Sequence, residues 1–227
     1  MLAAAAALLV SGGRAAASTR AVSAAAGVQA PAIYRQFGDL DGLLREAARE
    51  VMRDYVRTKA LRTPLADPLE ELRRGFDQHV AFGLAHPAVF AILSTATGDD
   101  DDDDDDDPER TGQAILHGLV ERLARAGLLR VTVDHAVALL HAAGAGATLA
   151  LIGTPAAARD PRVATDLREA TIAAITIPAS TTTTSASTSA VAARAIALQS
   201  VLGHDGCSVL SPGERRLLDE WLTRLSS

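Results

Sequence analysis

Nine residues between Ser18 and Arg35 carry groups that could bind a nucleic acid. A glutamine side chain can hydrogen-bond the edge of adenine, and small apolar side chains can contact the methyl group of thymine. Hydroxyl, phenol and guanidinium groups can bind phosphate oxygens. The candidates for base contacts are Gln29, Ala30, Pro31 and Ala32, and the candidates for phosphate contacts are Ser18, Thr19, Arg20, Tyr34 and Arg35.

A short helix is predicted to begin near the first of these residues. The hydroxyl of Ser18 or Thr19 can accept a hydrogen bond from an unpaired N–H group of a first helical turn. Val22 and Ala26 lie four residues apart, so they share one face of that helix. Gly27 can adopt the positive φ that often ends a helix. The sequence therefore predicts a short helix followed by a tight turn.

A second short helix follows the turn. Pro31 is tolerated in its first turn, where the missing N–H group costs nothing. Ile33 and Phe37 lie four residues apart and are expected to face inward. This leaves Gln29 and its neighbours on the outer face. Two short helices joined by a glycine-containing turn are typical of a helix-turn-helix.

The amino-terminal stretch resembles the DNA-binding domain of the tetracycline-repressor (TetR) family of bacterial transcription regulators. The resemblance covers residues 1–55, and the interval from Gly13 to Gly27 is unbroken. Leu43 and Leu44 also fit the start of the fourth helix of that family. The matched positions are Gly13, Ala16, Ser18, Arg20, Val22, Ala26, Gly27, Val28, Ile33, Tyr34, Arg35 and Phe37.

The resemblance implies a function and a set of partners. We expect a cytoplasmic transcription regulator, not an enzyme, that binds a double-stranded DNA operator as a homodimer. The resemblance further implies a repressor that an unidentified small-molecule effector releases from the operator, with no cofactor. Ligand binding would then act by shifting the population toward a conformation whose two DNA-binding domains are wrongly spaced.

Two departures from the family pattern favour an alternative. The basic amino-terminal arm of many relatives is missing. Where the family often has a phosphate-binding lysine at the start of the fourth helix, this chain has Leu40 between Asp39 and Asp41. The alternative is a dimeric small-molecule-binding or interaction protein whose DNA-binding domain has weakened or lost its affinity for an operator.

The composition favours an all-α fold. Hydrophobic residues make up 48% of the 227 residues, many of them Ala and Leu, whereas aromatic residues make up only 3%. We expect a helix-turn-helix domain over residues 1–60, a helical ligand-binding and dimerisation domain over 61–177, a Thr/Ser-rich linker over 178–189, and a helical tail packing on the body over 190–227. No run is expected to be long and apolar enough to span a bilayer, so no membrane partner is expected.

The charge of the chain is dominated by one segment. The formal net charge is −6, but it becomes +3 when the nine aspartates of residues 99–107 are set aside. Nine adjacent carboxylates repel one another and bury nothing, which is typical of a mobile loop. Carboxylates could also bind Ca²⁺ or Mg²⁺, but the run lacks the spaced ligands and the glycine of a defined site. No metal site is therefore expected.

The first ten residues allow a second interpretation. MLAAAAALLV is short and apolar, as in a secretory signal peptide, which would make the chain an exported helical protein. No positive residue precedes the apolar run, however. The helix-turn-helix pattern also requires an apolar first helix here, with Leu2, Ala5 and Leu9 facing the core. The single cysteine, Cys207, suits a reducing compartment.

The body is expected to consist of amphipathic helices. Apolar residues recur at helical spacing over residues 39–59, 69–83, 88–95, 109–126, 133–152 and 160–177. Within the resemblance, the last two of these look like the pair that forms a four-helix dimer interface. An effector site between helices would be mostly apolar with a few polar groups. Its candidate residues are Phe76, His79, Phe82, Phe90, His117 and His141, each of which could equally be a core or surface residue.

The tail contains the only cluster that could suggest catalysis. His204, Asp205 and Cys207 lie together in GHDGCS, but neighbours in a flexible stretch rarely align as nucleophile and base. We interpret this cluster as a turn. Ser211 and Glu214 predict a capping box, and Trp221 with the nearby leucines is expected to form an apolar face that packs on the body.

Overall fold

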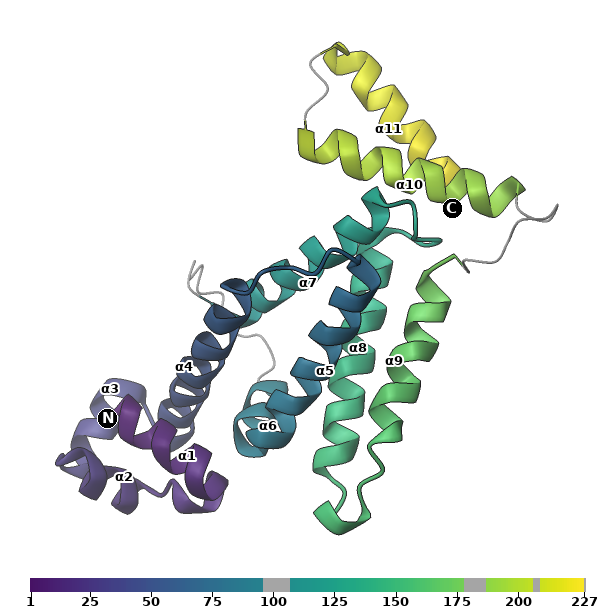
Figure 1. The fold of residues 1–227 in the computed structure, drawn as a ribbon. Helices are drawn as coiled ribbons and strands as arrows, with labels where there is room; N and C mark the ends of the chain where they lie inside the picture. Colours follow the sequence, from purple (N-terminus) through teal and green to yellow (C-terminus); the bar gives the residue numbers. More distant parts are fainter. Residues whose placement is uncertain (96–106, 178–186, 206–208, 227) are drawn as a thin grey trace. The chain divides into compact units, whose positions relative to one another are not determined.

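The computed structural model describes residues 1–95, 107–177, 187–205 and 209–226, and within these residues the chain is built of helices (Figure 1). Backbone pairing between extended residues is limited there to one bridge between Leu129 and Thr176. The predicted all-α fold class is confirmed. The helices are α1 Leu2–Ala16, α2 Thr19–Ala26, α3 Ala30–Phe37, α4 Leu40–Ala60, α5 Pro68–Ala85, α6 Pro87–Thr95, α7 Pro108–Arg125, α8 Val133–Ile152, the short 3₁₀ helix η1 Ala156–Ala158, α9 Arg162–Ile175, α10 Ser187–Asp205 and α11 Pro212–Ser226.

The chain divides into two compact units. Unit 1 contains Met1–Thr63, His79–Gln113 and Thr148–Arg159. Unit 2 contains Pro64–Gln78, Ala114–Ala147 and Asp160–Ser227. Helices α5, α7 and α8 each have residues in both units. The boundaries predicted from the sequence at residues 60, 177 and 189 stay predictions.

Unit 1 has one hydrophobic core that joins the amino-terminal helices to α5 and α6. Helix α1 packs against α2, α4 and α6, and α3 packs against α2 and α4. Small side chains let these helices approach closely, because alanine adds little bulk at a helix contact. The buried members are Ala5, Leu9, Ala17, Val22, Ile33, Leu43, Leu44, Ala47, Ala48, Phe82, Val89 and Leu93. A substitution at one end of this core can therefore alter the side-chain packing at the other end.

The boundaries of the amino-terminal helices follow local rules. The N–H group of Ala21 donates to Ser18 Oγ at 3.2 Å, so Ser18 caps α2 as predicted. Gly27 ends α2 with a φ of 66°, a left-handed conformation that favours glycine. Asp39 caps α4 by accepting from the N–H group of Gly42 at 2.7 Å. These caps fix where α2, the turn and α3 lie along the chain.

Helix α1 has a kink near its end. Gly13 has a φ of 67° and a ψ of −168°, outside the helical region, and the helix continues for one short turn beyond it. Arg14 in this last turn lies 2.6 Å from a carboxylate oxygen of Asp41 on α4. The kink and the ion pair together anchor the end of α1 to the start of α4.

A close contact between α5 and α8 depends on Gly83. A Cβ atom at this position would lie 2.1 Å from Cγ2 of Thr148 and 3.1 Å from the ring of Phe90. Thr148 is fully buried. Any larger residue at position 83 would therefore push α5 away from these neighbours.

Unit 2 has a second core, formed by α5, α7, α8, α9 and α10. Its buried residues are Leu72, Val120, Leu123, Ala124, Leu129, Ala136, Leu140, Ile172, Ile175 and Ile196. Two backbone hydrogen bonds, from Arg130 to Ile175 and from Ile177 to Leu128, hold the end of α9 beside the turn that follows α7. Ile196 places α10 against this core.

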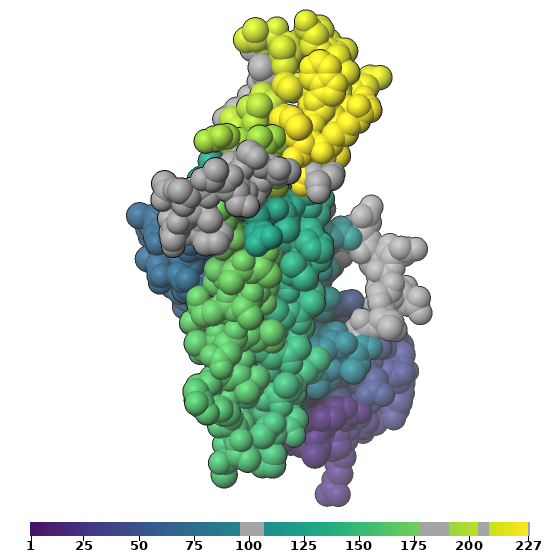
Figure 2. All heavy atoms as spheres, turned by 90° about the vertical axis from the view of Figure 1, so that its right-hand side faces the viewer, coloured from purple at the N-terminus to yellow at the C-terminus, as the bar shows by residue number. Residues whose placement is uncertain are grey.

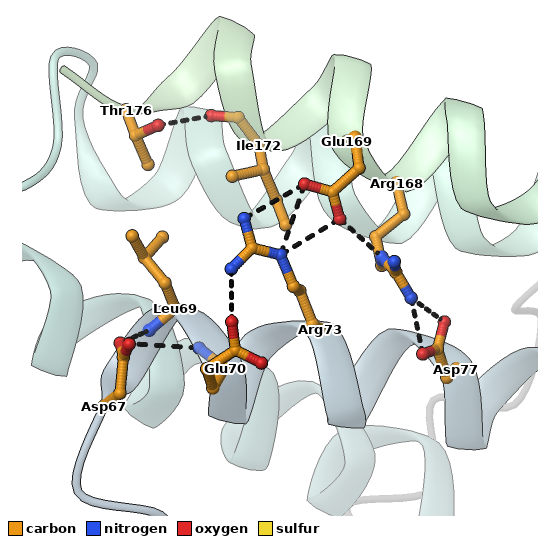
Figure 3. A network of polar contacts seen from close by, with 9 residues as sticks. All are labelled: Asp67, Leu69, Glu70, Arg73, Asp77, Arg168, Glu169, Ile172 and Thr176. Carbon is orange, nitrogen blue, oxygen red and sulfur yellow. Dashed lines mark hydrogen bonds and ion pairs between the residues drawn. The ribbon is translucent and has the colours of Figure 1, made fainter. Parts of the chain in front are cut away.

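An ion-pair network ties α9 to α5 in unit 2 (Figure 3). Arg73 Nε lies 3.0 Å from Glu169 Oε1, and Arg73 also contacts Glu70 at 2.7 Å. Arg168 contacts both Glu169 and Asp77. Hydrogen bonding from Arg73 lowers the pKa of Glu169 below its usual value, although partial burial opposes this shift. The network therefore stabilises unit 2 above the ordinary pKa of a glutamate and weakens as the pH falls below it.

The tail folds as a hairpin of α10 and α11. The predicted capping box is present, since the Glu214 carboxylate accepts from Ser211 Oγ at 2.7 Å and from the Ser211 N–H group at 2.8 Å. Leu222 is buried, but Trp221 is 52% exposed. The expectation that Trp221 packs on the body is therefore wrong, because the inward face of α11 is the one that carries Leu222.

Helix α8 corrects the expectation that no segment could span a bilayer. By length and composition alone, Val133–Ile152 is long and apolar enough to do so, and 33% of this stretch is buried. A helix that is apolar on all sides is also found in the interior of helical proteins and at their interfaces. Figure 2 shows α8 and α9 lying side by side on one face. The exposed residues of α8 include the small residues Ala138, Ala142 and Gly146.

Candidate nucleic-acid interface

Helix α3 presents the predicted base contacts to solvent on its outer side. Ile33 is fully buried and fixes the rotation of the helix. Gln29 and Pro31 are exposed, whereas Ala30 and Ala32 are half-buried. Gln29 makes no side-chain capping hydrogen bond to α3, so its amide is available for another partner. The small residues let a partner surface approach the backbone of this helix.

The predicted phosphate contacts lie on α3 and at the start of α2. Tyr34 is 50% exposed, and Arg35 is exposed beside it. Ser18 and Arg20 are exposed, and Thr19 is half-buried. The Ser18 side chain binds the N–H group of Ala21, and the N–H groups of the residues before Ala21 have no intrahelical partner because they begin the helix. A helix amino terminus with free N–H groups favours an anion.

Only some of the cations in this region are available for a polyanion. Arg20 and Arg35 have no carboxylate partner among the residues that the structure describes. Arg14, in contrast, is paired with Asp41. Asp39 is occupied in capping α4, and Leu40 packs on the unit 1 core. The start of α4 is therefore acidic and offers no phosphate-binding side chain.

The predicted effector residues fall in both units. His79, Phe82 and Phe90 belong to unit 1, and the rings of His79 and Phe90 meet edge to face at 5.4 Å. Phe76 and His117 belong to unit 2, and His141 is exposed on α8. The imidazole of His117 lies between Glu121 at 3.5 Å and Asp134 at 3.6 Å.

Two residues beside Phe82 were missed in the sequence analysis. Tyr55 on α4 stacks on the Phe82 ring at 4.2 Å, and His86 lies 5.0 Å from the same ring. The phenol oxygen of Tyr55 and Nδ1 of His86 are buried without a hydrogen-bond partner. Burial raises the pKa of Tyr55 to about 12, so the phenol keeps its proton. His86, at the break between α5 and α6, places its imidazole against Phe82.

Neither a metal site nor a catalytic cluster emerges from the described residues. Within residues 1–95, 107–177, 187–205 and 209–226, no three His, Cys, Asp or Glu side chains group in a way that could hold a metal ion. His204 and Asp205 belong to the last turn of α10, and Cys207 lies outside the described residues. The polyaspartate run also falls outside them, apart from Asp107.

Comparison with known proteins identifies the amino-terminal domain. Residues 1–47 match the family model described as bacterial regulatory proteins, tetR family. None of the curated proteins is significantly similar to the chain.

Two solved structures resemble the chain. A candidate tetR family transcription regulator from Shewanella sp. PV-4 is similar with a TM-score of 0.51 and 16% identity, over 78% of this chain and 96% of that chain. A TetR transcriptional regulator from Streptomyces coelicolor matches with a TM-score of 0.41 and 24% identity, over 78% of this chain and 97% of that one. The first of these supports the fold. Residues 1–47 are therefore similar to bacterial regulatory proteins of the tetR family, and the fold of the chain resembles that of a solved structure described as a tetR family regulator.

Proposed function

We propose that the protein is a homodimeric repressor that a small-molecule ligand releases from its operator. The observation that carries this proposal is the outer face of α3, where Gln29, Tyr34 and Arg35 are exposed over the fully buried Ile33. Such a helix can enter the major groove while its neighbours bind the backbone. Because few of its side chains are charged, sequence recognition would rest on Gln29, on contacts with thymine methyl groups and on DNA shape.

Dimerisation supplies the second recognition helix. Two helices must lie about 34 Å apart to read successive major grooves on one side of DNA. Ala138, Ala142 and Gly146 of α8 are exposed, and so are Val163 and Leu167 of α9, at 44% and 37% exposure. The small residues of α8 let a helix of a second copy approach closely, and Val163 and Leu167 of α9 add apolar area to the contact. We assign these residues to the homodimer face.

We assign the effector region to the aromatic cluster of Tyr55, Phe82 and His86. A ligand there could satisfy the phenol of Tyr55 and Nδ1 of His86, both of which lack a partner. Tyr55 and Phe82 pack in the same core as Ile33 of α3. A ligand that separates Tyr55 from Phe82 would therefore bias the position of α4 and of the DNA-binding helices it supports.

The proposal is tested by selecting duplexes that the purified protein retains from a random pool and then titrating the selected operator. We expect Tyr34→Ala to lower the operator affinity about tenfold, corresponding to ~1.4 kcal/mol, while sedimentation shows an unchanged dimer. Gln36→Ala, at an exposed position of the same helix that is not among the predicted contacts, serves as the control. A Tyr34→Ala protein that binds as tightly as the wild type would refute the assigned role.

The alternative is a dimeric ligand sensor that no longer binds DNA. It is favoured by the acidic start of α4 and by the pairing of Arg14 with Asp41. Binding through phosphates must weaken steeply with salt, because each neutralised phosphate releases counterions. No retention of duplexes even at low salt would favour the sensor, whereas retention that weakens steeply with salt would favour the DNA-binding regulator.

A further inference from the structure

The tail presents an apolar face, the exposed side of α11, that stays open to solvent among the described residues of unit 2. Helix α11 carries five large apolar residues at helical spacing, and α10 covers only the side of Leu222, which is 6% exposed. Leu217, Trp221 and Leu225 are 45%, 52% and 51% exposed on the other side. Exposed apolar residues that follow one another along a helix mark a contact site more often than single ones do.

Helix α10 also carries exposed apolar residues. Val191 and Leu198 are each 44% exposed, and Val201 is 38% exposed. These residues lie at spacings of seven and three, so they share one side of α10. Trp221 is also the only tryptophan of the chain. Tryptophan is enriched at protein interfaces, because burying its large ring removes much apolar surface from water.

The charges of α11 argue against a nucleic acid or an anionic membrane as the partner. Pro212–Ser226 contains three acidic and three basic residues, so its formal charge is zero. Most of these charges have partners within the hairpin, since Glu214 binds Ser211, Arg224 binds Glu220, and Gln199 binds Asp219. A polyanion or an anionic bilayer would require a basic excess. A neutral apolar face does not repel a second copy of itself.

The spacing of the exposed residues points to that second copy. Leu217 and Leu225 lie four residues before and after Trp221, so the stripe has the same residue at equal distances, about 6 Å along the axis, on either side of its centre. A contact between identical subunits about a two-fold axis requires such self-complementarity, since residue i meets j and j meets i. We propose that the α11 helices of two copies pair antiparallel about a two-fold axis at Trp221, with Leu217 of each copy against Leu225 of its mate.

Fluorescence of the single tryptophan tests this contact in the full chain. We expect emission of the wild type to shift to the blue and to resist acrylamide quenching as the protein concentration rises. The variant Leu217→Glu/Leu225→Glu should keep red-shifted, readily quenched emission at every concentration. Leu61→Glu, at a leucine that is 82% exposed elsewhere, is the matched control and should behave as the wild type does. Emission of the wild type that is red-shifted and freely quenched at all concentrations would overturn the proposal.

Cysteine cross-linking tests the direction of the pairing. In a Cys207→Ser background, Trp221→Cys should form a disulfide with itself, because position 221 lies on the axis. A mixture of Leu217→Cys and Leu225→Cys chains should cross-link more than either chain alone. Two copies of position 217 would lie about 12 Å apart along the axis, too far for a disulfide. Cross-linking of Leu217→Cys with itself, and none in the mixture, would overturn the antiparallel arrangement.

The α11 contact is independent of the proposed homodimer face. Leu167→Glu on α9 should impair the homodimer and operator binding but leave the concentration dependence of Trp221 emission in place. Leu217→Glu/Leu225→Glu should have the opposite effects, with operator binding of the dimer retained. Loss of both properties in the Leu167→Glu protein would show that α11 has no contact of its own and would overturn the proposal.

Discussion

Two helical hairpins of this molecule obey the same local rules and expose opposite chemistry. In the amino-terminal pair α2–α3, a serine caps the first helix, and the burial of Ile33 leaves polar and cationic groups on the exposed side of α3. In the carboxy-terminal pair α10–α11, a serine caps the second helix, and Leu222 turns Trp221 and two leucines outward. Capping and burial thus set the geometry of each pair, whereas the outward residue types determine which partner each pair can bind.

The largest effect is expected from truncating the buried side chain beneath each exposed face. Ile33→Ala and Leu222→Ala each remove a buried side chain, which costs about 2–5 kcal/mol. We expect urea denaturation to show comparable losses of stability for the two variants. Only Ile33→Ala should abolish operator binding in a gel shift. If Leu222→Ala abolished it to the same degree, the two hairpins would not be functionally separate.

The second comparison is between a free and a paired arginine. Arg35 has no carboxylate partner among the described residues, whereas Arg224 contacts Glu220 within α11. Arg35→Ala should weaken operator binding about tenfold and reduce the slope of log affinity against log salt by about 1. Arg224→Ala should leave both quantities unchanged. An equal effect of the two substitutions would mean that the overall charge, and not the position on α3, controls binding.

A smaller effect is expected from removing the caps. Ser18→Ala and Ser211→Ala should each cost ~1 kcal/mol of stability. The first should also weaken operator binding, because it disturbs the helix start that carries Thr19 and Arg20. The second should change only the circular dichroism of the tail. Equal operator affinities of the wild type and Ser18→Ala would show that the start of α2 makes no contact with DNA.

The smallest expected effect is a dependence of helix stability on pH, which only the cap of α11 should show. Hydrogen bonds from Ser211 lower the pKa of Glu214 below its ordinary value of 4.5, so this cap stabilises α11 above that pH and is lost as the pH falls below it. The cap of α2 has alanine in the equivalent position, Ala21, and gains nothing from a carboxylate. Circular dichroism between pH 6 and 3 should show a small loss of helix that Glu214→Gln removes. An unchanged titration in that variant would contradict the assignment.

The local features of the fold could be predicted from the sequence. Ser18, Gly27 and Pro31 set the limits of α2 and α3 through short-range rules, and the structure follows them. The helical spacing over residues 69–83 and 88–95 also predicted separate helices there, which correspond to α5 and α6. Each of these features depends on residues within one helical turn of one another, which is why a sequence pattern is sufficient.

Contacts between distant segments could not be predicted in the same way. The stacking of Tyr55 on Phe82 depends on how α4 lies against α5, and no spacing along the chain encodes it. The outward orientation of Trp221 depends on which side of α11 meets α10, and both sides carry leucines.

The kink at Gly13 has a consequence for how the first helix can vary. A side chain at this position would be strained by the positive φ of 67°, so the site tolerates little besides glycine. Without the bend, the helix would run on straight, and the guanidinium of Arg14 would leave the carboxylate of Asp41. The released arginine would then be free for a phosphate, so one glycine near the chain start controls how positive the surface next to the groove-reading helix can become.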